Sequence, residues 1–433
     1  GYGGDECGRG DGVVGGALIG MYARCGAVRE ARCVLDHLPS PRHLISWSAL
    51  ISAYSQHGHG HQALQCLSEM HREGLSPDVV TFISILKACR ITGSLHKGKQ
   101  IHDEIASKGL LANNIALANS LVSMYTKCGE LAAAQRVFDE LPVRNTISWS
   151  ALIAGYTQHG RAQEALNCFE LMQTEGLSPD AVTFTCILKA CASFRCVERG
   201  KQIHDDVVNR GLLHKDNVLG NALVDMYAKC GMLPKAEELL KELPARNVVS
   251  WNTLIAGYSQ QDRGYEALDC FERMQKEGIS ANGVTFSCTL KACGHIKAID
   301  KGITIHDEIV KMGLLIEDIV LGNALVDMYA KCGMLPKARQ VLSELPLRNV
   351  VSWNTLIAGY DQHEHGLESL NSFSQMQIEG FLPDAVTYVC SLRACGSIGA
   401  TDKGKQIHTE IIDRRLLENS IILGNSLVYM YSK

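Results

Sequence analysis

The chain of 433 residues lacks a strong charge of either sign and lacks long apolar runs. Its formal net charge is −4 and its sequence pI is about 6.5, so no broad basic field attracts a polyanion, and contacts with anions must be local. No apolar stretch approaches the roughly 18 residues that span a bilayer, which predicts no membrane partner. Residues 1–12 are glycine-rich and acidic, unlike a signal or transit segment or a phosphate-binding loop.

Cysteine pairs with C-x-x-C spacing are also absent. Without such a pair, the H-x-E triplets that begin at His102, His306 and His408 do not complete the zinc deaminase signature. The alternating histidines at 57–61 have metal-like spacing, but they fall in a predicted turn and the other copies of that turn do not keep them. We therefore interpret the H-x-E histidines as helix residues and predict no metal, no cofactor and no catalytic residue.

The 17 cysteines do not indicate a disulfide scaffold, because they recur at equivalent positions inside apolar helical patterns. Neighbouring helices lie about 8–10 Å apart, so equivalent cysteines three hairpins apart should be separated by about 30 Å. We predict reduced thiols that serve as small core residues. One such set is Cys89, Cys191, Cys293 and Cys395, and another is Cys128, Cys230 and Cys332.

A tandem repeat dominates what is present. Its clearest copy is R-N-V-V-S-W-N-T-L-I-A-G-Y at 246–258, and the only four tryptophans occupy one position of it, 102 residues apart, at Trp47, Trp149, Trp251 and Trp353. Self-similarity at a fixed period indicates a repeat architecture rather than separate globular domains.

Each 102-residue unit divides into helical hairpins of 35, 36 and 31 residues, at 248–282, 283–318 and 319–349 in one copy. In the first of these, Trp251, Leu254, Ile255 and Tyr258 follow helical spacing, a polar turn interrupts it, and Gly278 is predicted to cap the second helix in a left-handed conformation. Each hairpin exposes an apolar face that only a neighbour can cover. The sequence therefore predicts an all-α solenoid of stacked helix-turn-helix repeats.

With V-V-S-W-N-T-L-I-A-G-Y, V-T-F-S-C-T-L-K-A-C and L-G-N-A-L-V-D-M-Y-A-K-C-G in rotation, the chain resembles the pentatricopeptide repeat family, and more narrowly its plant PLS subclass. The resemblance implies a right-handed superhelix and one continuous array from residue 12 to residue 433. A poorly ordered segment is expected at 1–11. The implied motifs are short at 12–43, 115–145, 217–247, 319–349 and, truncated, 421–433; standard at 44–78, 146–180, 248–282 and 350–384; and long at 79–114, 181–216, 283–318 and 385–420.

The resemblance further implies recognition of single-stranded RNA, one base per repeat, by the fifth and the last residue of each motif on the concave side. Standard motifs supply Ser48 with Asp78, Ser150 with Asp180, Asn252 with Asn282, and Asn354 with Asp384. Short motifs supply Asn119 with Asn145, Asn221 with Asn247, and Asn323 with Asn349, whereas the long motifs that keep a polar fifth residue supply Thr185 with Asp216 and Ser287 with Asp318.

In the family's pairing rules, Ser with Asp resembles a guanine reader, Asn with Asp a uracil reader, and Asn with Asn a pyrimidine reader. Thr185 with Asp216 and Ser287 with Asp318 would favour guanine. The first short motif has Gly16 at its fifth position, so we expect it to read no base. Second-position residues that would sandwich bases are Ile147, Val249, Val320 and Val351, and lysines that would meet phosphates are Lys127, Lys229 and Lys331.

Each assignment has a structural alternative. Asp or Asn directly before a helix is also a good N-cap, as at Asp78, Asp180 and Asp384. A lysine in the last turn of a helix also compensates the helix dipole. The Asn and Ser residues inside first helices favour binding, because they form helices poorly and yet recur there.

We therefore expect a sequence-specific RNA-binding solenoid. The resemblance implies the targeting part of a mitochondrial or chloroplast RNA-processing factor, most often one that selects cytidines for conversion to uridine. The deaminase would come from a C-terminal extension or a partner protein, and the end at Lys433 within a repeat suggests a longer protein. The alternatives are a helical-repeat scaffold for protein partners and a repeat fragment without function.

Overall fold

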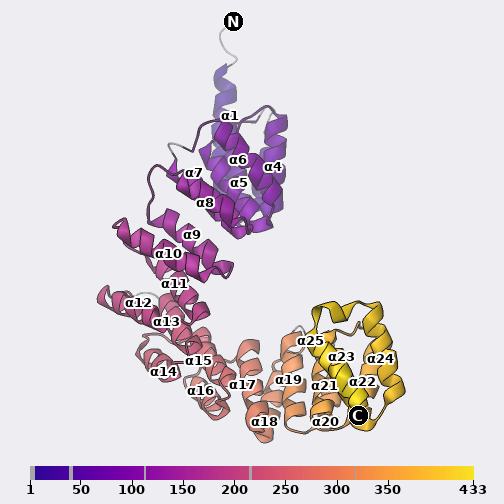
Figure 1. Cartoon of the computed structure of the whole chain (residues 1–433). Coiled ribbons are helices and arrows are strands. Elements are labelled where there is room, and N and C mark those ends of the chain that lie inside the picture. Colours follow the sequence, from indigo (N-terminus) through magenta and orange to yellow (C-terminus); the bar gives the residue numbers. More distant parts are fainter. Residues whose placement is uncertain (1–4, 39–41, 112–113, 214–216, 317) are drawn as a thin grey trace. The chain divides into compact units, whose positions relative to one another are not determined.

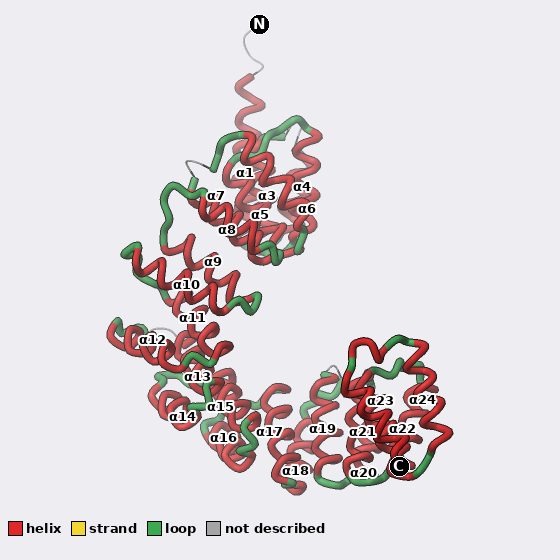
Figure 2. The backbone as a smooth tube through the Cα atoms, in the orientation of Figure 1, coloured by secondary structure: helices red, strands yellow, loops and turns green. Residues whose placement is uncertain are grey.

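The computed structural model describes residues 5–38, 42–111, 114–213, 217–316 and 318–433 (Figure 1). Within these ranges every regular element is a helix and none is a strand (Figure 2), which confirms the predicted all-α fold. None of the helices in these ranges is both long enough and apolar enough to cross a membrane.

The chain divides into two compact units, Gly1–Ala222 and Leu223–Lys433, and α13 (Asn217–Lys229) contains the boundary between them. The helices of the first unit are α1 (Asp5–Arg24), α2 (Val28–His37), α3 (Leu44–Gln56), α4 (Gly60–Arg72), α5 (Val79–Thr92), α6 (Leu95–Ser107), α7 (Ile115–Lys127), α8 (Leu131–Asp139), α9 (Thr146–Gln158), α10 (Ala162–Thr174), α11 (Ala181–Phe194) and α12 (Val197–Asn209).

The second unit continues with the same alternation of first and second helices. Its elements are α14 (Leu233–Glu242), α15 (Val248–Gln260), α16 (Gly264–Lys276), α17 (Gly283–Ile296), α18 (Ile299–Lys311), α19 (Ile319–Lys331), α20 (Leu335–Glu344), α21 (Val350–Gln362), α22 (Gly366–Ile378), α23 (Ala385–Ile398), α24 (Thr401–Asp413), the short 3-10 helix η1 (Leu416–Asn419) and α25 (Ile421–Ser432).

Stacking of apolar faces holds the hairpins together. On α15, Trp251, Leu254 and Ile255 are fully buried, because α15 contacts both its hairpin partner α16 and the next first helix, α17. The same contacts recur around α3 and α21. Each first helix is therefore covered by its own hairpin and the following one, as the predicted solenoid requires. The hand of a superhelix stays a prediction.

The ends of the hairpins follow the local sequence. Gly278, two residues after the end of α16, has a φ of 75°, which confirms the predicted left-handed cap. At the other end of the chain, α1 begins at Asp5 and includes residues 5–11, which the sequence placed in a poorly ordered segment. No proline lies in this stretch to stop the helix.

The repeated cysteines behave as core residues. Cys89, Cys191, Cys293 and Cys395 are buried and form no disulfide. Burial raises the pKa of the Cys89 and Cys293 thiols to about 12, so both stay protonated at neutral pH. These thiols are small apolar groups rather than nucleophiles.

The H-x-E histidines join neighbouring hairpins. His102 Nδ1 lies 2.8 Å from the hydroxyl of Tyr125, and His306 Nδ1 lies 2.9 Å from that of Tyr329. Burial lowers the pKa of both imidazoles, which favours their neutral form. Each histidine ties the second helix of a 36-residue hairpin to the next first helix, and the described ranges contain no cluster of metal-ligating side chains.

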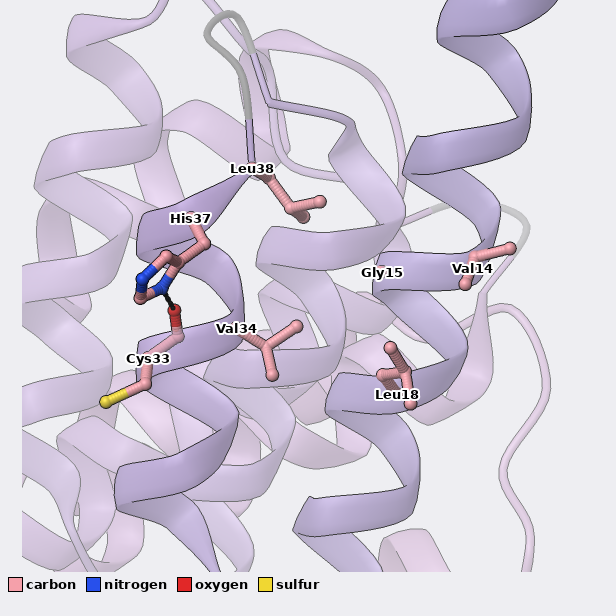
Figure 3. A pocket seen from close by; sticks show the side chains of 7 residues that line it. All are labelled: Val14, Gly15, Leu18, Cys33, Val34, His37 and Leu38. Atoms are coloured by element: carbon pink, nitrogen blue, oxygen red, sulfur yellow. Dashed lines mark hydrogen bonds between the residues drawn. The ribbon is translucent and has the colours of Figure 1, made fainter.

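The hairpin of α1 and α2 has an apolar surface that no other described hairpin fills. Val14, Leu18, Val34 and Leu38 line an apolar groove on it, beside His37 (Figure 3). Interior hairpins cover such surface on one another, so an isolated hairpin would expose much of its core.

Replacing Phe271 tests the stacking. Phe271 on α16 is 1% exposed and its ring lies 6.2 Å from that of Phe286 on α17. We expect Phe271→Ala to lower the free energy of unfolding by about 3–5 kcal/mol, as measured by urea denaturation. Tyr265→Ala on the same helix is the control, because Tyr265 is 74% exposed. Equal effects of the two changes would contradict this account of the core.

Candidate nucleic-acid interface

A row of exposed β-branched residues marks the second position of the first helices. Ile147, Val249, Val320 and Val351, predicted from the sequence, are between 54% and 64% exposed. The sequence analysis did not predict the other members of this row. Their shared position, one residue after the start of a first helix, could have identified them. They are Ile45, Val80, Val182, Val218, Val284, Val386 and Ile422. These side chains lie outside the core, and large apolar side chains exposed at regular intervals form a candidate binding surface.

The fifth residues lie deeper on the same helices. Ser150, Asn252 and Asn354 are only 7–8% exposed. Burial of polar side chains is costly unless they are hydrogen-bonded, so their partners decide what they present to a ligand.

Open grooves bring these two rows together. In the second unit, one groove is lined by Val249 and Val284 from the second positions, Asn252 from the fifth, Asn282 from the last, and Lys229. The groove therefore has aliphatic side chains from two neighbouring hairpins and a polar pair between them.

The first unit repeats the arrangement twice. One groove is lined by Asn119, Asn145 and Ile147, and the next by Ser150, Asp180 and Val182 together with Ile147 and Lys127. Ile147 lines both grooves, so one second-position residue contributes to two successive sites.

The predicted pairs are in direct contact in three of the four 35-residue hairpins. Asn354 Nδ2 donates to both carboxylate oxygens of Asp384 at 3.0 Å, and Asn252 Nδ2 donates to Asn282 Oδ1 at 3.0 Å. The Ser150 hydroxyl lies 3.4 Å from Asp180.

Two other pairs are joined less directly. Asn119 Nδ2 donates to Asn145 Oδ1 at 3.5 Å. Ser48 reaches Asp78 through Thr81, whose hydroxyl lies 2.6 Å from the Ser48 hydroxyl and donates to Asp78 at 2.6 Å.

The last residues also cap helices, so capping and pairing are not alternatives. Asp180 accepts a hydrogen bond from the Thr183 amide at 2.8 Å, and Asp384 accepts one from the Thr387 amide at 2.9 Å. The other capping residues of the predicted set are Asp78, Asn145, Asn247, Asn282, Asp318 and Asn349. A cap holds each side chain in one rotamer.

The remaining candidates make fewer contacts of the kind seen in these pairs. The Thr185 hydroxyl donates to the Ala181 carbonyl of its own helix, Asn221 is half-buried on α13, and Ser287 is half-buried on α17. Asn323, on α19, has an amide oxygen without a hydrogen-bond partner within the described ranges. Asp216 lies outside the described residues.

The three lysines differ in their surroundings. Lys229 forms an ion pair with Asp225 at 2.9 Å and Lys331 forms one with Asp327 at 2.7 Å. Lys127 has Ser123 at the corresponding position and lines a groove. Contact with a phosphate by Lys229 or Lys331 would therefore compete with an aspartate.

These features define a solenoid of helical hairpins with a row of amphipathic grooves. The model described as "PPR repeat family" matches residues 42–90, 144–193, 246–295 and 348–397, and that described as "PPR repeat" matches residues 117–145, 221–248 and 323–350. The chain belongs to the pentatricopeptide repeat family.

Two relatives from Arabidopsis thaliana illustrate the likeness. The mitochondrial pentatricopeptide repeat-containing protein At3g09040 is 36% identical over 99% of this chain and 41% of its own length. The chloroplastic pentatricopeptide repeat-containing protein At4g18520 is 35% identical over 91% of this chain and 63% of its own length. The chain thus spans less than two thirds of either relative.

A solved structure has the same fold. The pentatricopeptide repeat protein PPR10, crystallised in complex with an 18-nt psaJ RNA element, superimposes with a TM-score of 0.76 at 18% identity, over 96% of this chain and 60% of that chain.

Two substitutions of Asp180 distinguish the contribution of its helix cap to stability from that of its charge. We expect Asp180→Ala to lower the free energy of unfolding by about 0.5–2 kcal/mol, because the Thr183 amide loses its acceptor. Asp180→Asn keeps an amide oxygen at the cap and should change stability much less. Chemical denaturation of both variants measures the difference, and comparable losses would exclude the capping role.

Proposed function

We propose that this chain binds single-stranded RNA and reads one base per hairpin. The observation that carries the proposal is the groove that recurs with the same composition, a polar pair between aliphatic side chains of adjacent hairpins. Aliphatic side chains such as Val249 and Val284 suit the two faces of a flat base, and the polar pair suits its edge. Single-stranded RNA offers unstacked bases with free edges to such a surface.

The polar pairs supply the chemistry of discrimination. The Asp384 carboxylate only accepts hydrogen bonds, so it favours a base edge that donates, such as the N3–H of uracil. Asn354 beside it adds amide N–H groups that suit a carbonyl of the same base. In the Ser48 and Ser150 hairpins, the small hydroxyl beside an aspartate leaves room for a purine, and the N1–H and N2–H groups of guanine are the donors that aspartate accepts.

The pairs from Ser48 to Asp384 give a proposed base order. Read 5′ to 3′, it is guanine, any base, pyrimidine, guanine, guanine, pyrimidine, pyrimidine, guanine, pyrimidine and uracil. The fifth and eighth bases rest on Thr185 with Asp216 and on Ser287 with Asp318.

We place the chain in the PLS subclass, as the target-recognition part of an organellar RNA-processing factor. Relatives whose names specify mitochondrial or chloroplastic proteins support that location. The proposed process is conversion of cytidine to uridine, in which this chain selects the site and a deaminase in a C-terminal extension or in a partner protein performs the chemistry.

Selection from a random pool of single-stranded RNA tests the proposal. The full chain should enrich the base order above when bound RNA is sequenced. Capture of protein partners without enrichment of any RNA sequence would instead indicate a helical-repeat scaffold.

Substitution of Asn354 should change the base preference at one position of the RNA. Asn354→Ser produces the Ser–Asp combination of the guanine-type hairpins, so preference at the tenth base should move from uracil toward guanine. Fluorescence anisotropy with four RNAs that differ only at that base measures the shift. Asn371→Ser is the control, because Asn371 is exposed on the second helix α22. An unchanged order of the four affinities would refute the assignment.

The affinity should depend only weakly on salt. Single-stranded nucleic acid contributes a slope of about −0.7 per neutralised phosphate, and the three candidate lysines would give a slope no steeper than about −2 in log K against log salt concentration. Pairing of Lys229 with Asp225 and of Lys331 with Asp327 makes it shallower. A titration with potassium chloride that gives a much steeper slope would show that other cations carry binding.

A further inference from the structure

After the 35- and 31-residue hairpins, the third residue of the next hairpin carries a buried hydroxyl beside the polar pair, whereas after the 36-residue hairpins it is a leucine. After the 35-residue hairpins this residue is a threonine, as at Thr285 and Thr387; after the 31-residue hairpins it is a serine, as at Ser148 and Ser352. All four side chains are 0% exposed. They cannot touch an RNA base themselves, yet each has one proton to donate.

Where threonine faces a fifth-position asparagine, its hydroxyl also lies 3.0 Å from a side-chain oxygen of the last residue, Asn282 or Asp384. The contact with the asparagine is the shorter one, so we assign the proton to it. The Thr285 hydroxyl accepts the Asn282 backbone N–H at 3.1 Å and donates to Asn252 Oδ1 at 2.6 Å. The Thr387 hydroxyl accepts the Asp384 N–H at 3.1 Å and donates to Asn354 Oδ1 at 2.5 Å. The amide oxygen of the asparagine therefore accepts a buried hydrogen bond in both hairpins. Its Nδ2 group, which donates to the last residue of the pair, is the side that a base can share.

Where the residue is serine, its proton stays within the cap. The Ser148 hydroxyl accepts the Asn145 N–H at 3.3 Å and donates to Asn145 Oδ1 at 2.9 Å. The Ser352 hydroxyl makes the equivalent bonds with Asn349 at 3.1 and 3.0 Å.

The fifth-position asparagines of these shorter hairpins therefore keep an unused acceptor. Asn119 Oδ1 and Asn323 Oδ1 are buried and have no hydrogen-bond partner in the part of the chain that the structure describes. Asn119 is only 8% exposed and lines a groove. A buried acceptor without a donor is costly, so a turn of the amide that brings this oxygen to an N–H group of a ligand in the groove is favoured.

We propose that this third residue is a specificity-determining positioning residue that decides which side of the asparagine amide a base meets. With serine, the asparagine accepts from an N–H of a pyrimidine, either uracil N3–H or cytosine N4–H. With threonine, it only donates, to a carbonyl or ring nitrogen of the base. This inference rests on the proposed reading of RNA, and it adds a buried residue to the asparagine-containing readers of the 35- and 31-residue hairpins.

Exchange of serine for threonine tests the inference. In Ser148→Thr, the hydroxyl should donate to Asn119 Oδ1 as Thr285 does to Asn252. Affinity of the full chain for RNAs with the favoured pyrimidine at the third base should fall by about three- to tenfold, the loss expected for one hydrogen bond. Affinity for RNAs with a purine there should change little, and selectivity at the other bases should stay the same.

Ser46→Thr is the matched control. Ser46 is also 0% exposed and is the third residue of its hairpin, but the fifth residue of the preceding hairpin is Gly16, which has no side chain to orient. The same added methyl group should therefore leave selectivity at every base unchanged. Thermal unfolding of both variants reports any loss of stability.

A second variant keeps the test decisive if Ser148→Thr does not fold. Thr285→Val removes the hydroxyl with little change of shape, which releases Asn252 Oδ1. The ranking of the four bases at the seventh position should then change by about three- to tenfold, and only there.

Two results would overturn the inference, and they are distinguishable. If the unmodified chain selects the third and seventh bases but Ser148→Thr behaves like Ser46→Thr, or Thr285→Val leaves the seventh base unchanged, the third residue has no part in reading. If the unmodified chain shows no base selectivity at all, the proposed function fails and the inference fails with it.

Discussion

Burial of each first helix between its own hairpin and the next one is the constraint on which the structure depends. Stacking buries the faces of α15 that contact α16 and α17. One face of the helix, which carries Val249 and Asn252, is not covered by these neighbours. The exposed aliphatic row and the polar pairs share that face because the second and fifth residues of a helix are three positions apart. The interface is thus a by-product of how the core is covered.

Helix capping makes this interface rigid. A last residue such as Asp384 ties one oxygen to the backbone N–H of Thr387 and also accepts from Asn354, so both side chains are held before any ligand arrives. Ordering a long polar side chain on binding costs conformational entropy, and a preorganised pair avoids much of that cost. Stability and the proposed recognition therefore use the same atoms at junctions such as this one.

The sequence predicted those parts that depend on periodicity. Hairpins and the Gly278 cap follow from spacing and from local propensities of turns and caps, whereas the residues of each pair were implied by the family resemblance. It missed the exposed second positions of the 36-residue hairpins, such as Val80, because an isolated valine looks like core. It also missed the aspartates at 225 and 327, which neutralise two of the three lysines.

By itself, therefore, the sequence determined the repeat, the helical class and which residues recur at equivalent positions, since these are properties of order along one chain. Only the tertiary structure decided the direction of each hydrogen bond. Thr285 lies 33 residues from Asn252, and their contact exists only because α17 stacks against α15. The amide oxygen of Asn252 has a partner, and that of Asn119 has none among the described residues. This difference depends on atoms that stacking brings within 3 Å, and no spacing along the chain encodes that distance.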